Sequence, residues 1–122
     1  MIRPIVQLGD PLLTTPCRPL ESEETAGETV RDLARDMSET LAQAGGVGLS
    51  APQVGESVRL ILAGSFPTAK NPDRPEIPVA VLINPRIVTA SDATEPAWEG
   101  CLSFLEYRVR VVRPVAEWLL LT

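Results

Sequence analysis

The stretch GGVGLSAPQVG, residues 45–55, separates the longest helical pattern in this sequence from its first strand pattern. Its glycines allow the backbone to approach a ligand or another chain segment closely. Gln53 adds a side-chain amide that donates to an oxygen and accepts from a nitrogen. From these residues alone two interpretations stay open: a ligand-binding loop, or a glycine-rich turn that joins helix and strand with Gln53 on the surface.

Upstream of this stretch, apolar residues recur at spacings of three and four between residues 25 and 44. They form a single apolar stripe, as expected for an amphipathic helix. The positions are Val30, Leu33, Ala34, Met37, Leu41 and Ala44. Thr25 followed by Glu28 predicts a capping box at the start of this helix, and Gly45 with Gly46 predicts its end.

Downstream, apolar and β-branched runs predict strands at residues 58–63, 80–83, 86–89 and 107–112. The proline-rich residues 67–78 predict a loop, and residues 95–103 are expected to be irregular. One long helix followed by strands and short loops predicts an α+β domain, with an antiparallel or mixed sheet packed on the N-terminal helix. We expect Leu33, Met37 and Leu41 to face strands 58–63 and 80–89.

The overall composition excludes several classes of protein. A chain of 122 residues with 44% hydrophobic and 22% charged residues fits one globular domain over residues 1–122. No apolar run approaches the ~18 residues of a membrane span. The net charge of -5 gives no electrostatic footprint for nucleic acid. The first residues lack the pattern of a secretory signal, which predicts a cytoplasmic protein.

The two cysteines, Cys17 and Cys101, are far apart in the sequence. Two distant cysteines in a reducing compartment are expected to be thiols rather than a disulfide. Cys101 stands in GCLS, residues 100–103, and the chain contains no histidine. Taken alone, Cys101 is either a metal-binding thiolate or a small buried apolar residue.

Residues 46–53, GVGLSAPQ, and residues 99–103, EGCLS, together resemble the first two signature motifs of the peptide deformylases. These hydrolases remove the formyl group from the N-terminal methionine of nascent bacterial proteins. The first motif is usually G-x-G-L-A-A-P-Q, so that Ser50 is the single departure, and the second motif is matched without change. The sequence LGDPLL, the helix before the first motif and INP at residues 83–85 occur in the same order as in that family.

The resemblance implies a metal site and an oxyanion site. In the family a divalent metal, commonly ferrous iron and often replaced by zinc or nickel, is bound by the cysteine of the second motif and by two histidines of a third motif, H-E-x-x-H. By analogy Cys101 would be the metal ligand. The side-chain amide of Gln53 and the backbone N–H of Leu102 would stabilise the oxyanion.

The resemblance also implies substrate contacts along the two motifs. Residues 46–48 would lie beside the bound peptide, Val47 and Leu49 would form pocket walls, and Arg108 would orient Glu99 or a neighbour. The implied substrate-binding residues are Gly46, Val47, Gly48, Leu49, Glu99, Gly100 and Arg108. The implied substrates are peptides with an N-terminal formyl-methionine.

The third motif is missing, because the sequence contains no histidine. We therefore expect a domain that is incomplete at its C-terminus, that binds no stable metal and that does not hydrolyse formyl peptides by itself. Three interpretations stay open: a truncated deformylase, a non-catalytic module that binds peptide N-termini, or a structural protein with deformylase ancestry.

The missing part also predicts self-association. Without it, we expect open apolar faces around Val109 and Val111, around Met37, and at residues 118–121. Leaving several hundred Å² of apolar surface in water would cost on the order of 10 kcal/mol at ~25 cal/mol per Å². A homodimer is the simplest assembly that covers such a patch, because a self-complementary surface closes under two-fold symmetry.

Overall fold

The structure, a computed structural model, describes residues 1–105, 107–114 and 119–121, and of the last three only the backbone. Trp118, part of the expected C-terminal apolar patch, lies outside the described residues. The described elements are η1 (Pro11–Thr14), α1 (Ser22–Thr25), α2 (Glu28–Ala44), β1 (Gly48–Ser50), η2 (Ala51–Val54), β2 (Leu60–Ser65), β3 (Ile77–Ile83), β4 (Arg86–Thr89), β5 (Thr94–Glu99), β6 (Val109–Pro114) and β7 (Leu119–Leu121).

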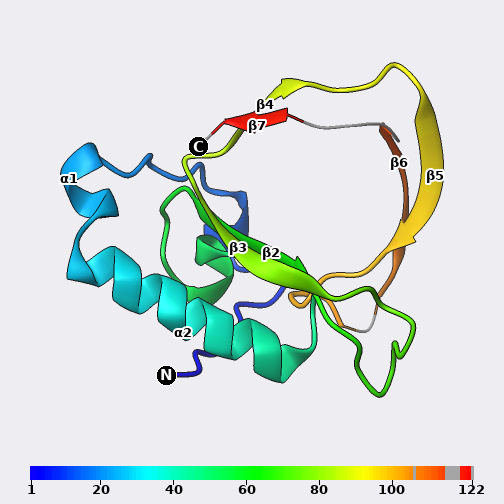
Figure 1. Ribbon diagram of the computed structural model, residues 1–122, viewed down its shortest axis with the longest axis horizontal. Helices are drawn as coiled ribbons and strands as arrows, with labels where there is room; N and C mark the ends of the chain where they lie inside the picture. Colours follow the sequence, from blue (N-terminus) through cyan, green and yellow to red (C-terminus); the bar gives the residue numbers. More distant parts are fainter. Residues whose placement is uncertain (106, 115–118, 122) are drawn as a thin grey trace.

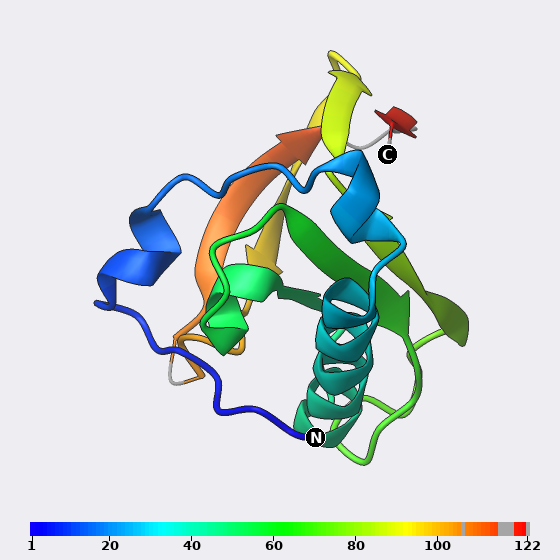
Figure 2. The ribbon, with the colours of Figure 1, turned by 90° about the vertical axis from the view of Figure 1, so that its left-hand side faces the viewer.

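The described strands form three antiparallel sheets. The first has the order β1-β2-β3, the second pairs β4 with β7, and the third pairs β5 with β6. Figures 1 and 2 show α2 on one face of the β1-β2-β3 sheet and the β5–β6 hairpin on its other side. The expected α+β fold, with antiparallel strands packed on one main helix, is confirmed.

The core lies between α2 and the first sheet. Leu33, Met37 and Leu41 are buried there, as their spacing in the sequence predicted. They pack in one cluster with Leu60 and Leu62 of β2. The expectation of an open apolar face around Met37 is wrong, because its side chain is 0% exposed. The sheet and the η2 turn cover that face of the helix completely.

The helical segment begins differently from the prediction. The expected capping box of Thr25 and Glu28 is not formed; α2 starts at Glu28, with Gly27 as its N-cap. Residues 22–25 form the separate one-turn helix α1, and its capping box joins Glu21 to Glu24. In this box the Glu24 carboxylate accepts from the backbone N–H of Glu21 over 2.7 Å. The predicted end at Gly45 is confirmed, with φ at 73°.

Several strand boundaries differ from the predicted ones, because pairing with a neighbouring strand decides where a strand begins and ends. β2 is shifted by two residues, to Leu60–Ser65, and the predicted loop 67–78 ends early because β3 begins at Ile77. Gly64 permits this pairing, since a Cβ there would stand 2.9 Å from the Cα of Val79. The last predicted strand starts at Val109 instead of residue 107.

Two expectations about the later strands are wrong. Residues 94–99 are not irregular but form β5, which pairs along its whole length with β6. A segment can become a strand by pairing with another strand even when its own sequence shows no alternating apolar pattern. Strand β4 is not part of the sheet that packs on the helix. The chain leaves that sheet after Ile83, and β4 then pairs with β7. The left-handed conformation of Asn84, with φ at 50°, makes that turn.

Candidate functional site

Gln53 lies on η2 and is held in one orientation by hydrogen bonds at both ends of its amide. Its Oε1 accepts from the backbone N–H of Ser50 (2.9 Å) and from the Ser50 hydroxyl (3.2 Å). Its Nε2 donates to Ser103 Oγ (3.0 Å) and to Cys101 Sγ (3.4 Å). Alanine, the usual residue at this position of the motif, has no hydroxyl and could not make the bond from the Ser50 side chain. Gln53 is only 9% exposed, so its amide direction is strongly determined.

Residues 101–104 form a tight turn that brings the second motif against Gln53. The backbone N–H of Phe104 donates to the carbonyl of Cys101 over 3.1 Å, which closes the turn. Cys101 is half-buried, and Ser103 is buried at 3% exposure. The side chain of Leu102 lies against Gly46, where an added Cβ would be 3.0 Å from its Cδ1. The two sequence motifs are therefore in direct contact.

The first motif continues into β1, which is the edge strand of the described β1-β2-β3 sheet. Val47 is 49% exposed. Leu49 is not on this open surface: it is 2% exposed and belongs to the core cluster. Val47 precedes β1, whereas Leu49 lies inside the strand with its side chain on the face that packs on the core. The expected pocket wall at Leu49 is thus corrected to a core position.

Glu99 at the end of β5 pairs with Arg113 of β6, whereas Arg108 was expected to orient Glu99 or a neighbour. Two hydrogen bonds of 2.8 and 2.9 Å join the guanidinium to the carboxylate. The register sets Glu99 opposite Val109, so Glu99 shares a face of the hairpin with the odd-numbered residues of β6. Arg108 precedes the strand and is exposed. The Arg113 guanidinium lowers the pKa of Glu99.

The residues present do not fit a catalytic divalent metal. Cys101 contributes a thiol, but its polar neighbours are an amide and a hydroxyl, and the sequence holds no histidine. Among the described residues there is no group of three or more His, Cys, Asp or Glu side chains arranged to bind a metal ion. Catalytic zinc and iron sites in proteins need about three such ligands.

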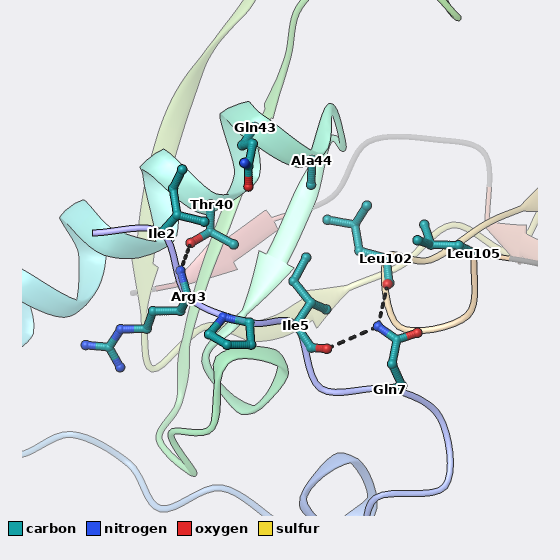
Figure 3. A pocket seen from close by; sticks show the side chains of 10 residues that line it. Ile2, Arg3, Ile5, Gln7, Thr40, Gln43, Ala44, Leu102 and Leu105 are labelled. Carbon is teal, nitrogen blue, oxygen red and sulfur yellow. Dashed lines mark hydrogen bonds between the residues drawn. The ribbon is translucent and has the colours of Figure 1, made fainter.

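The structure adds an N-terminal segment to the site. The backbone N–H of Val6 donates to the carbonyl of Gln53 (2.7 Å), and that of Leu8 donates to the carbonyl of Ser103 (2.8 Å). The Nε2 of Gln7 donates to the carbonyls of Leu102 (3.2 Å) and Ile5 (3.1 Å) (Figure 3). No periodicity in this proline-containing segment marks these contacts in advance.

A cavity of about 480 Å³ opens between this N-terminal segment, the last turns of α2 and the loop after Cys101 (Figure 3). Its lining includes Ile2, Ile5, Gln7, Gln43, Leu102 and Leu105. Leu102 therefore contacts Gly46 of the first motif and also borders this separate cavity. Across the described part of the chain, none of the helices is both long and apolar enough for a membrane crossing.

Comparisons with known proteins agree with this arrangement. A family model described as polypeptide deformylase matches residues 2–117. Peptide deformylase 1 of Bordetella pertussis is 44% identical over 103 residues, which are 84% of this chain and 57% of the relative. Peptide deformylase 1 of Nitrosomonas europaea is 37% identical over 93% of this chain and 63% of its own length. The chain thus spans about three fifths of these curated relatives.

Solved structures show the same fold. A class I type b peptide deformylase from Acinetobacter baumannii bound to Met-Ala-Ser superposes with a TM-score of 0.87 at 33% identity, covering 93% of this chain and 72% of that one. The peptide deformylase from Ehrlichia chaffeensis in complex with actinonin gives a TM-score of 0.78 at 30% identity, over 93% of this chain and 63% of that one. With both motifs joined at Gln53, this chain belongs to the polypeptide deformylase family.

Proposed function

We propose that this chain carries the peptide-binding and oxyanion-binding part of a deformylase site. The observation that supports the proposal most directly is the junction of the motifs, where Gln53 Nε2 donates to both Cys101 and Ser103. The formyl oxygen of a bound peptide would accept hydrogen bonds from this amide and from the N–H of Leu102. To do so, it would take the place of one of the present acceptors of Nε2.

The peptide backbone would bind along the exposed edge of β1. An edge strand offers unpaired backbone groups, and an extended peptide can add to it as a further strand. Gly46 and Gly48 have no side chains that would keep a peptide away from this part of the chain. The exposed Val47 would provide an apolar contact for a substrate side chain. The Acinetobacter baumannii relative binds Met-Ala-Ser, which supports a short N-terminal peptide as the ligand class.

Hydrolysis in the family depends on iron or on zinc or nickel, and Cys101 is one proposed ligand. A single thiolate does not hold such an ion against water, so further donors would have to come from outside this chain. We infer that this chain alone binds formyl-methionyl peptides without releasing formate. The second candidate function is a non-catalytic module for peptide N-termini, which the lack of histidine in all 122 residues favours. Both functions belong in the cytoplasm, where nascent bacterial proteins are processed.

The test is a titration of the ¹⁵N-labelled full chain with formyl-Met-Ala-Ser, followed by NMR. We expect saturable shifts at the Gln53 side-chain amide, at Leu102 and at residues 46–48, together with weaker binding of unformylated Met-Ala-Ser. A parallel assay for formate should show no release. Absence of any saturable shift at these positions would refute peptide binding. Formate release by the metal-free chain would refute the inference that this chain alone is inactive.

A matched variant separates specific binding from general effects. Gln53→Leu removes the amide but keeps a side chain of similar size, and it should abolish the shift at Leu102. Gln43→Leu changes an exposed amide on α2 and should leave the titration unchanged. Equal binding by both variants would remove Gln53 from the proposed site.

A further inference from the structure

The N-terminal segment contacts both motifs through consecutive residues. Val6 binds the first motif at the carbonyl of Gln53, while Gln7 and Leu8 bind the second motif at the carbonyls of Leu102 and Ser103. These three residues therefore bridge segments that lie about 50 positions apart in the sequence. Because the two backbone bonds need no particular side chain, Gln7 carries the sequence-specific part of this bridge.

The carbonyl that Gln7 binds belongs to the central peptide of the turn formed by residues 101–104. In such a turn the outer peptides are held by the closing hydrogen bond, here from Phe104 to Cys101. The central peptide, which joins Leu102 to Ser103, can flip between the two common turn types. In the flipped type Ser103 would need a positive φ, which costs energy for any residue other than glycine. In the structure Ser103 has no positive φ.

A flip of this peptide would strain the turn that carries the proposed Leu102 donor. A positive φ at Ser103 would strain the turn there, and Ser103 supplies the Oγ that accepts from Gln53 Nε2 over 3.0 Å. The flip would also disturb Leu102, whose side chain is seated against Gly46. Figure 3 shows the Gln7 amide pointing directly at the Leu102 carbonyl from the N-terminal segment.

We propose that Gln7 is a positioning residue, which holds the Leu102–Ser103 peptide in one orientation and thereby keeps in place the turn that carries the Leu102 N–H and the Ser103 partner of Gln53. The inference rests on the proposed function, because it concerns the same oxyanion-binding groups. Gln7 does not touch the bound peptide in this scheme. Its amide acts through the carbonyl of Leu102 and through the side chain of Ser103.

The experiment compares three variants of the full chain without any ligand. Gln7→Met removes the donor but keeps the length of the side chain, and Gln7→Lys restores a donor of similar reach. Gln43→Met, in the same cavity but on α2, is the control. Backbone NMR reports the Leu102 carbonyl shift, the Gln53 side-chain amide and the hydrogen exchange of the Phe104 amide.

We expect Gln7→Met to move the Leu102 and Gln53 resonances and to speed exchange at Phe104 by about twofold to tenfold, the range of one net hydrogen bond. Gln7→Lys should bring these values back toward the parent, and Gln43→Met should leave them unchanged. Unchanged resonances and exchange in Gln7→Met, or no recovery in Gln7→Lys, would overturn the proposal.

A second arm measures binding of formyl-Met-Ala-Ser by the same variants. Gln7→Met should weaken it by the same twofold to tenfold, while Gln43→Met should not. If the parent chain fails to bind this peptide, the proposed function fails. The positioning role of Gln7 is then still decided by the ligand-free measurements, so the two failures are distinguishable.

Discussion

The side-chain amide of Gln53 donates to Sγ of Cys101 over 3.4 Å, although 48 positions separate the two residues in the sequence. This contact joins the first motif, on the η2 turn, to the second motif, in the turn after β5. Ser50 holds the other end of the same amide. The direction of the Gln53 amide is therefore determined by both motifs together.

Replacing Gln53 should destabilise the fold as well as alter the site. Gln53→Leu leaves the part-buried N–H of Ser50 and the buried hydroxyl of Ser103 without their Gln53 partner. Unpaired buried groups cost about 1–3 kcal/mol, so we expect the free energy of unfolding in urea to fall by that amount. The exposed Gln43→Leu should change it by less than about 0.5 kcal/mol. Equal stability of the two variants would contradict this reading of the network.

A methyl group at Gly46 should displace Leu102. In Gly46→Ala the new Cβ would meet Leu102 Cδ1 at 3.0 Å and Cγ at 3.2 Å. We expect a loss of about 1 kcal/mol in unfolding free energy and shifted methyl resonances of Leu102, because crowding in a packed contact is costly. In Gly48→Ala the nearest atom is the Leu62 carbonyl oxygen at 3.5 Å, an ordinary contact, so Leu102 should not move. Identical Leu102 spectra in the two variants would rule out this contact.

The ion pair between Arg18 and Glu24 predicts a pH effect near α1. The Arg18 guanidinium, and then the backbone N–H of Glu21, lower the pKa of Glu24 to about 2. A carboxyl whose folded pKa is lowered adds stability above its unfolded pKa, and that stability is lost as pH falls toward the folded pKa. The window here lies between about 4.5 and about 2.

Removing the guanidinium should raise this pKa. In Arg18→Met we expect the Glu24 carboxyl to titrate closer to 4.5 in a ¹³C NMR titration, while the bond from Glu21 keeps it somewhat below. Arg35→Met removes an exposed pair with Asp32 on α2 and should leave Glu24 unchanged. A Glu24 midpoint that stays near 2 in Arg18→Met would show that the backbone bond alone sets it.

Exposed apolar residues on the β5–β6 hairpin should make the chain self-associate. Trp98 is 68% exposed and Val112 is 63% exposed, and the register places both on one face of the hairpin. Exposed apolar side chains on a sheet face are often covered by a partner, and a second copy in a two-fold dimer is the simplest cover. Sedimentation velocity at micromolar concentration should show a dimer, and Trp98→Thr with Val112→Thr should shift it toward monomer. A parent chain that sediments as a monomer would exclude this assembly.

Several features followed from the sequence alone because their causes are local. The apolar stripe of α2 and its end at Gly45 depend on residues three to five positions apart, which any helix brings together. The two motifs identified the family without knowledge of their contact. The lack of histidine is a matter of composition.

Tertiary structure alone decided the features that depend on strand register and chain path. The partner of Glu99 is Arg113 and not the nearer Arg108, because the β5–β6 ladder sets which side chains share a face. The same pairing made a strand of residues 94–99, whose own pattern is irregular. Gln7 reached the Leu102 carbonyl because the N-terminal segment folds back between the two motifs. Sequence spacing carries no information about such contacts, since they form between segments that only the folded core brings side by side.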